Sequence, residues 1–422
     1  MRIAVVGSGV AGLVSAHVLS RVHDVTVFEA NARVGGHTNT RRVERFGRVY
    51  AVDTGFIVFN ERTYPGFIRL LDRLGVASQP TAMSFSVRDE RDGLEYNGTD
   101  LNRLFAQRRN LLRPSFLRMV ADIRRFYQDA PRLLEGDDDA LTLGRYLTDG
   151  AYSRAFVEQH VIPMGAAVWS ADPKRMLEFP ARYLVQFFAN HGFLRVGDRP
   201  TWRVVSGGSQ AYLAPLTRSF AARIRLGCPV REVVRQAGGV RVTAAAGVTH
   251  TFDAVVLAAH SDDALRVLAD PSPAERAILG SIPYQRNEVV LHHDARLLPR
   301  CRRAWAAWNY HVLPDARAAA TVTYNMNILQ GIVSPEPFCV TLNRAAAIDP
   351  AKVIERFVYD HPVYTPAGVA AQRRWHEISG VNRTYFCGAY WGYGFHEDGV
   401  QSGLAVARQF GLDLDATLPA AA

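Results

Sequence analysis

Short apolar runs separated by glycine-rich turns open the chain and predict alternating strands and helices. Residues 3–6 form a β-branched apolar run typical of a buried parallel strand. A helical pattern continues through residues 13–20, and residues 24–28 form a second strand-like run. Residues 81–199 then follow mostly a helical period, whereas residues 281–379 alternate as sheet strands do. The pattern predicts an α/β unit first, with helical and sheet-rich parts after it.

A glycine-rich turn joins the first strand to the first helix. Gly7, Gly9 and Gly12 have the spacing G-x-G-x-x-G. Gly7 permits the sharp turn, Gly9 lets backbone N–H groups approach a pyrophosphate, and Gly12 lets the helix pack closely on the strand. Glu29 follows the second strand, where the ribose hydroxyls of a dinucleotide need an acceptor. A carboxylate there disfavours a 2′-phosphate, so the turn predicts FAD or NAD and not NADP.

The residues after this turn favour FAD over NAD. Residues 29–37 read E-A-N-A-R-V-G-G-H and resemble the E-x-x-x-R-x-G-G-R continuation of flavoproteins of the amine oxidase and phytoene desaturase superfamily. In that superfamily the loop passes close to the pyrophosphate and ribityl chain of FAD. His37 stands where arginine is usual, which removes one charge from the phosphates, although an imidazole N–H can still donate a hydrogen bond.

Later segments resemble the same superfamily in the same order. Residues 53–55 resemble its D-x-G turn, residues 206–211 its Gly-Gly segment before a helix, and residues 228–258 its strands near the adenine. Residues 385–403 resemble its C-terminal flavin motif, in which a helix, starting here near Gly399, directs its dipole at the flavin. The resemblance implies non-covalent FAD bound by Gly7, Ser8, Gly9, Val10, Ala11, Gly12, Glu29, Ala30, Arg33, Gly35, Gly36, His37, Thr38, Thr54, Gly55, Phe56, Val230, Ala258, Gly388, Gly399 and Val400.

The order of these segments predicts two interleaved domains. We expect a Rossmann-like, three-layer α/β FAD-binding domain built from residues 1–80, 200–280 and 380–422. Residues 81–199 and 281–379 should form an α+β substrate-binding domain between those segments.

Charge is concentrated in one segment. The chain carries 49 basic and 40 acidic residues, a net charge of +9, but residues 103–132 hold eight arginines interleaved with apolar residues at helical spacing. This pattern is typical of helices that lie on an anionic membrane or guard the entrance for an acidic substrate. A solvated helix face beside a core stripe is the alternative. The arginines match no nucleic-acid-binding motif, so we expect no nucleic-acid partner.

Cysteine usage and hydropathy bear on location. The four cysteines show no C-x-x-C spacing, which predicts neither a disulfide framework nor a metal site. We expect no signal peptide and no membrane span. The expected location is the cytoplasm, with peripheral contact at the inner membrane face if the basic segment binds lipid. Nothing in the sequence predicts the oligomeric state.

Four residues are candidates for the chemistry. Polyamine-oxidase-like members of the superfamily carry a lysine on a substrate-domain strand that resembles residues 287–294, but no lysine is present there, and Glu288 is the best match. Glu288 or His396 could accept a proton. Trp391 and Tyr393 could form walls of an aromatic cage over the flavin, although core packing is the alternative for each.

The strings at residues 35–40 and 388–399 resemble a bacterial subgroup of the superfamily linked with cyclopropane-type and furan fatty acid modification. That resemblance implies dehydrogenation of a hydrophobic, methyl-branched fatty acyl or phospholipid chain by hydride transfer to flavin N5. Two alternatives remain open. One is a flavin amine oxidase without the usual lysine, and the other is a non-catalytic FAD-bearing protein that binds lipid.

Overall fold

A computed structural model describes residues 1–195, 197, 199–315 and 319–415. Residues 416–422 of the expected third FAD-binding segment, and residues 196, 198 and 316–318 of the expected substrate-binding segments, lie outside the described residues. Among the described residues, no helix has the length and apolar character needed to cross a bilayer.

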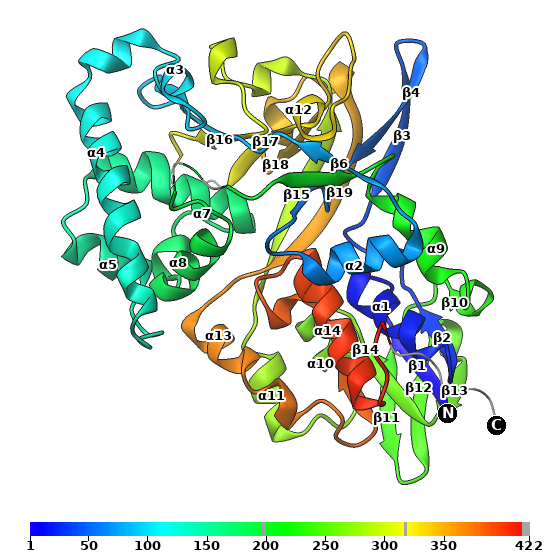
Figure 1. The fold of residues 1–422 in the computed structure, drawn as a ribbon. Coiled ribbons are helices and arrows are strands. Elements are labelled where there is room, and N and C mark those ends of the chain that lie inside the picture. The colour runs from blue at the N-terminus through cyan, green and yellow to red at the C-terminus, as the bar shows by residue number, and fades with distance from the viewer. Residues whose placement is uncertain (196, 198, 316–318, 416–422) are drawn as a thin grey trace.

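A five-stranded parallel sheet forms the centre of the first unit (Figure 1). Its strands, in spatial order, are β10 (Ile224–Arg225), β2 (Asp24–Phe28), β1 (Arg2–Val6), β14 (Ala254–Leu257) and β20 (Thr384–Phe386). Four of them, β1, β2, β14 and β20, are short and mostly buried, as strands covered on both faces must be. The predicted strand at residues 24–28 has these bounds, and the predicted strand at residues 3–6 begins one residue earlier.

Helices cover one face of this sheet and a small antiparallel sheet covers the other. The helices α1 (Val10–Leu19), α2 (Pro65–Leu74) and α14 (His396–Gln409) share one apolar core with the sheet, together with α9 (Leu213–Thr217). The strands β11 (Glu232–Gln236), β12 (Gly239–Thr243) and β13 (Thr249–Phe252) pack on the opposite face, beside α10 (Ser261–Val267), α11 (Pro273–Leu279) and α13 (Pro366–Gln372). The expected three-layer, Rossmann-like FAD-binding fold is confirmed.

A seven-stranded mixed sheet forms the second unit. Its strands, in spatial order, are β19 (Val353–Pro362), β15 (Tyr284–His292), β18 (Cys339–Leu342), β17 (Thr321–Asn325), β16 (Trp308–Val312), β7 (Phe85–Asp89) and β8 (Glu95–Asn97). Smaller sheets join β3 (Thr40–Arg45) to β4 (Arg48–Asp53), and β9 (Trp202–Val205) to β5 (Phe59–Asn60) and β6 (Ser78–Thr81).

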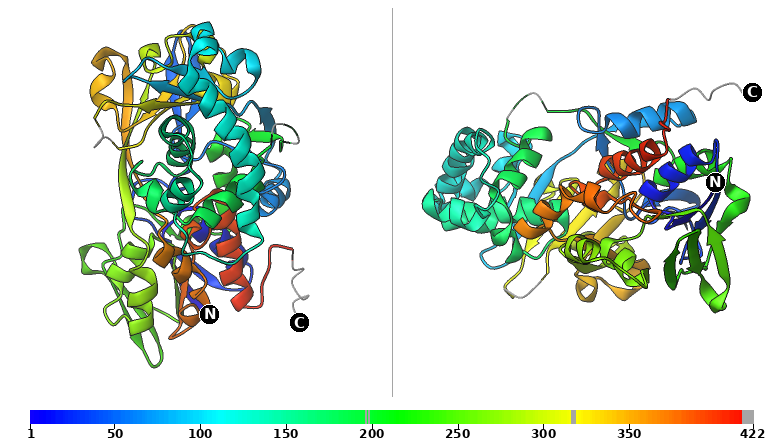
Figure 2. Two further views of the ribbon diagram at one scale, coloured as in Figure 1. Left: turned by 90° about the vertical axis from the view of Figure 1, so that its left-hand side faces the viewer. Right: turned by 90° about the horizontal axis from the view of Figure 1, so that it is seen from below.

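Helices gather at the end of the molecule away from β11–β13 (Figure 2). They are α3 (Leu101–Leu104), α4 (Pro114–Asp129), α5 (Leu143–Asp149), α6 (Arg154–Phe156), α7 (Ile162–Trp169) and α8 (Ala181–Asn190), while α12 (Met326–Gln330) packs against the larger sheet. The helical group and one face of the seven-stranded sheet share a single apolar core. Strands of the first sheet come only from the segments expected to bind FAD, but the domain boundaries themselves stay a prediction.

Candidate functional site: a dinucleotide cradle and an apolar chamber

A cavity of about 650 Å³ runs from the carboxyl ends of β1 and β2 to the seven-stranded sheet. Ligands of open α/β sheets bind at this edge, because the loops that leave the strands there line a crevice. One end is lined by the glycine-rich turn and the other by aromatic residues of the second unit.

The three glycines of the first turn have different reasons to be glycine. Gly7 has a φ of +107°, and a Cβ there would lie 2.6 Å from the Ala258 carbonyl oxygen. A Cβ on Gly12 would overlap the Gly7 carbonyl oxygen. Gly9 is the residue before α1, has an ordinary φ of −68°, and a Cβ there would meet no protein atom within 4 Å. Gly9 lines the cavity, so the fold does not need glycine there but a closely approaching ligand does.

Glu29 ties this turn to the loop that follows β2. Its Oε2 accepts hydrogen bonds from the backbone N–H (2.9 Å) and the hydroxyl (2.5 Å) of Ser8. Its Oε1 accepts from the backbone N–H and the side-chain amide of Asn31, both at 2.8 Å. A carboxylate accepts about four hydrogen bonds, so a ribose hydroxyl would have to replace the Ser8 hydroxyl or the Asn31 amide.

The loop after Glu29 is held by Arg33. The guanidinium donates to the carbonyl oxygens of Gly36 (2.8 Å) and Thr38 (3.1 Å). Gly35 and Gly36 have φ values of +112° and +56°, and Gly36 packs against Gly9. Arg33 therefore shapes the loop that brings His37 beside the start of α1.

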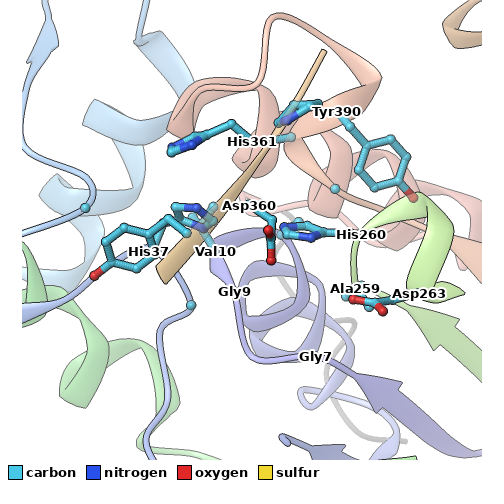
Figure 3. A pocket seen from close by; sticks show the side chains of 18 of the residues that line it. Gly7, Gly9, Val10, His37, Ala259, His260, Asp263, Asp360, His361 and Tyr390 are labelled. Carbon is cyan, nitrogen blue, oxygen red and sulfur yellow. The ribbon is translucent and has the colours of Figure 1, made fainter. Parts of the chain in front are cut away.

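Three imidazoles surround this end of the cavity (Figure 3). The ring centroid of His37 lies 5.3 Å from that of His361 and 6.2 Å from that of His260. Burial, and then the two neighbouring imidazoles, hold the pKa of His37 well below its usual range. Its Nε2 is buried without a hydrogen-bond partner. A buried polar nitrogen without a partner costs free energy, and a phosphate oxygen would supply the missing partner.

A second polar group lies where α14 begins. The Nε2 atom of His396 lies 2.9 Å from the Thr38 hydroxyl and 3.1 Å from the Tyr212 hydroxyl. The His396 ring stacks on Phe56 with centroids 3.4 Å apart. Burial lowers the pKa of His396 to about 3, so the ring is neutral near pH 7. The helix starts at His396 and not near Gly399, because the Asp398 carboxylate accepts a hydrogen bond from the Phe395 N–H and caps the earlier turn.

Comparison with known proteins decides the family. Residues 10–292 match the model of the flavin containing amine oxidoreductases, which is more than half of the chain. The chain belongs to this family. Its cofactor is FAD, and the expected class of FAD-dependent oxidoreductases is confirmed at the level of the family.

Curated relatives are distant. A Mycobacterium tuberculosis protein assigned as a flavin-containing monoamine oxidase is 27% identical over 260 residues, which cover 58% of this chain and 54% of that protein. The L-amino-acid oxidase of Bungarus fasciatus is 24% identical over 339 residues, covering 73% of this chain and 59% of that protein. The chain thus spans little more than half the length of these relatives.

Solved structures share the fold over nearly the whole chain. Cyclohexylamine oxidase from Brevibacterium oxydans matches with a TM-score of 0.70 and 15% identity, covering 97% of this chain and 99% of that one. A fatty acid isomerase from P. acnes matches with a TM-score of 0.69 and 16% identity, covering 97% and 98%. Identities this low establish the fold alone.

The residues present fit FAD. Gly9 leaves space for a close approach, Glu29 offers a carboxylate to the ribose, and the unpartnered Nε2 of His37 lies beside the start of α1. Most residues that the resemblance assigned to FAD line the cavity: Gly7, Ser8, Gly9, Val10, Ala11, Glu29, Ala30, Arg33, Gly35, Gly36, His37, Gly55, Phe56, Val230, Ala258 and Gly388. As individual ligands of FAD they stay predictions.

Five of the assigned residues lie behind the cavity wall. A Cβ on Gly399 would press on Val10, and Gly12 and Val400 pack where α1 meets the sheet and α14. The Thr54 hydroxyl donates to the Asn39 carbonyl oxygen (3.0 Å), and Thr38 contacts His396 as described above. These contacts hold the lining elements in place, and the assignment of the five residues to FAD binding stays a prediction.

Two of the four residues expected to take part in the chemistry lie elsewhere. Glu288 is on the exposed side of β15, where it forms a 2.9 Å ion pair with Arg356. Its neighbours Asn287 and Val289 are buried, and side chains alternate along a strand, so Glu288 must point away from the site. Trp391 borders a separate depression beside Arg182 and Gln372. The structure therefore does not bring Glu288 or Trp391 to the cavity where a proton acceptor or a cage wall was expected.

The other two line the cavity, with changed roles. Tyr393 lies beside Tyr183, with ring centroids 4.5 Å apart. His396 is present, but a base works best when its pKa is near the working pH, and a pKa of about 3 makes it a poor proton acceptor. His396 instead orients the hydroxyl groups of Thr38 and Tyr212 through its hydrogen bonds.

The far end of the cavity is an apolar chamber that the sequence did not predict as a unit. Val168 and Trp169 come from α7, and Trp308 and Tyr324, whose rings meet edge to face at 5.2 Å, come from β16 and β17. Asp360 on β19 also lines the cavity, but it lies beside His260 at the dinucleotide end (Figure 3). The sequence patterns also did not predict Tyr212, His260 and His361 as residues of the site. Of these three, Tyr212 follows a segment that the resemblance had linked to the FAD-binding domain, residues 206–211.

Proposed function

We propose that the protein is an FAD-dependent dehydrogenase of a hydrophobic, methyl-branched fatty acyl or phospholipid chain. The observation that carries the proposal is the apolar chamber, whose walls include Val168, Trp169, Trp308 and Tyr324. Apolar walls bind a hydrocarbon chain by removing its surface from water. The same fold is used by the fatty acid isomerase from P. acnes, so an acyl substrate is compatible with this architecture.

The reaction removes hydrogen from two adjacent carbons and leaves a carbon–carbon double bond. FAD, when bound, supplies the two-electron acceptor that takes one of these hydrogens as hydride. The other leaves as a proton, which we propose passes to water, because Glu288 lies outside the cavity and Asp360 lies beside His260 at the dinucleotide end (Figure 3). Reoxidation requires an acceptor such as dioxygen or a quinone.

The proposal keeps FAD non-covalent. Cys387 is fully buried and is not among the residues that line the cavity, and burial raises the pKa of its thiol to about 12, so its reactive thiolate form is suppressed. It also keeps the protein in the cytoplasm, in contact with the inner membrane face.

An amine oxidase is the second candidate, because the aromatic residues that line the cavity could contact an ammonium group through their ring faces. The curated relatives include a protein assigned as a monoamine oxidase and an L-amino-acid oxidase. The acyl dehydrogenase and the amine oxidase differ in substrate: the first needs a chamber that holds a hydrocarbon chain, and the second needs one that holds an ammonium group.

Filling the chamber tests the proposal. We expect Val168→Trp to weaken binding of a methyl-branched fatty acid at least about 10-fold, because the larger ring occupies the volume that the chain needs. Binding would be followed by the change in flavin absorbance during titration. The FAD content should be unchanged, since Val168 lies on α7, away from the glycine-rich turn.

Val333→Trp is the matched control, because Val333 is 83% exposed and does not line the cavity. It should bind the fatty acid like the wild type. Equal affinity in Val168→Trp and the wild type would remove the chamber as the acyl site.

A further inference from the structure

Exposed leucines gather on one short stretch of the surface. Leu112 is 88% exposed, Leu101 75%, Leu111 49% and Leu117 44%. They lie on α3, on the 3₁₀ turn Arg108–Leu112, and on the first turn of α4. The Arg108 guanidinium donates to the Phe105 carbonyl oxygen (3.2 Å), so this turn lies against the end of α3. Monomeric proteins rarely expose apolar side chains in such a group without a partner.

Leu111 and Leu112 belong to the apolar pattern that the sequence indicated for residues 103–132, but the rest of that pattern behaves differently. Phe116, Met119 and Phe126 of that pattern are buried in the core of the helical group. The amphipathic face of α4 is therefore occupied by the fold itself. What remains for a partner is the corner where α3, the 3₁₀ turn and α4 meet (Figure 1).

Arginines surround the exposed leucines. Arg103, Arg108, Arg109, Arg118 and Arg124 are all exposed. Four acids lie nearby and each is paired: Asp100 with Arg103 (3.6 Å), Asp92 with Arg113, buried Asp122 with Arg118 and Arg125, and Asp129 with Arg132 (3.9 Å). Arg108, Arg109 and Arg124 form none of these ion pairs, so the surface keeps a positive charge. The surface formed by Leu101, Leu111, Leu112 and Leu117 with Arg103, Arg108, Arg109 and Arg118 is called the α3–α4 surface below.

We infer that the α3–α4 surface docks on an anionic phospholipid bilayer. Leucine side chains enter the boundary between headgroups and acyl chains, while arginines at the same level meet lipid phosphates. The two features occur together here, as membrane-surface helices require. A second copy of the chain fits this surface less well, because a two-fold self-contact would place the same arginines against one another.

The α3–α4 surface and the apolar chamber pack on the same apolar core. The core that holds Phe116 and Met119 is the one against which Trp308, Tyr324 and Tyr393 pack. The α3–α4 surface and the chamber therefore belong to one rigid packing unit. The inference does not depend on the proposed dehydrogenation, because membrane docking would serve any ligand that comes from the bilayer.

Vesicle flotation with the full-length, FAD-loaded protein tests the inference. We expect binding to vesicles of phosphatidylcholine mixed with phosphatidylglycerol, little binding to phosphatidylcholine alone, and release by added salt. The double variant Leu111→Ser/Leu112→Ser should lose at least about 10-fold in partitioning, since both side chains leave the acyl boundary. Its flavin absorbance reports that it is folded.

The matched control is Leu226→Ser/Val248→Ser, which alters two residues that are 47% and 51% exposed on the FAD-binding side. It should float like the wild type. A second test pair, Arg108→Gln/Arg109→Gln, should reduce binding to anionic vesicles and weaken the salt dependence.

Three results would overturn the inference: no flotation of the wild type, equal flotation of the leucine variant, or equal loss in the control. A dimer in light scattering that dissociates in the leucine variant would assign the surface to self-association instead. Flotation is measured without turnover, so its outcome is separate from that of the proposed reaction.

Discussion

Gly9→Ala is expected to give a folded protein that has lost most of its FAD. A Cβ at Gly9 meets no protein atom within 4 Å and φ is ordinary, so the change introduces no clash in the protein. The new methyl group projects into the cavity where backbone N–H groups must approach the pyrophosphate. We expect FAD affinity to fall about 100-fold, or about 2.8 kcal/mol, since each tenfold is about 1.4 kcal/mol.

The measurement is FAD titration of the apoprotein by flavin fluorescence, with circular dichroism to follow the fold. Gly238→Ala is the control, because its Cβ would also meet no protein atom but lies in an exposed turn outside the cavity. Gly12→Ala provides the contrast, since its Cβ overlaps the Gly7 carbonyl oxygen and should unfold the turn itself. Normal FAD affinity in Gly9→Ala would mean that the cofactor does not bind closely at the glycine-rich turn of residues 7–12.

Asp53→Ala is expected to cause the largest loss of stability. Its carboxylate accepts hydrogen bonds from the hydroxyl of Thr40 (2.5 Å), from the backbone N–H (2.9 Å) and hydroxyl (2.8 Å) of Ser209, and from the side-chain amide of Gln330 (3.0 Å). These partners join β3, the turn after β9 and α12 of the second unit. Removing the acceptor leaves several buried donors unpaired, which should lower the free energy of unfolding by about 3 kcal/mol.

Urea unfolding at several pH values tests this expectation. Burial raises the pKa of Asp53 to about 6, above the value of about 3.9 for an exposed aspartate. The folded protein then holds this proton more tightly, so its contribution to stability falls as the pH rises from about 4 to about 6. Asp53→Asn should remove that fall, and Asp24→Ala, at an exposed position, should change stability by less than about 0.5 kcal/mol. A stable Asp53→Ala protein would show that the hydrogen bonds are not needed.

Local sequence rules predicted the dinucleotide end of the site because that end is built from neighbouring residues. Gly7, Gly9, Gly12 and Glu29 all belong to one strand–turn–helix–strand unit, so their spacing alone places them together. The loop that follows Glu29 was predicted from its resemblance to the R-x-G-G segment of the superfamily. The start of α14 was missed by three residues, because the cap that Asp398 provides depends on a side-chain hydrogen bond.

The other half of the site depends on which distant segments meet. Glu288 is the best match to the lysine position of the resemblance, but in the structure its buried neighbours on either side show that it faces outward on an alternating strand. His37, His260 and His361 come from three remote parts of the chain, and no local pattern links them. The chamber likewise combines α7 with β16 and β17, a meeting that only tertiary packing determines.

The most direct test of the proposed dehydrogenation is an anaerobic titration of the FAD-loaded protein, followed by the absorbance of oxidised flavin. Vesicles of methyl-branched unsaturated phospholipid would be compared with straight-chain vesicles and with a panel of polyamines. The proposal predicts that the branched lipid alone bleaches the flavin, because hydride transfer reduces it when no acceptor is present. Bleaching by a polyamine, or no bleaching by the branched lipid, would contradict it.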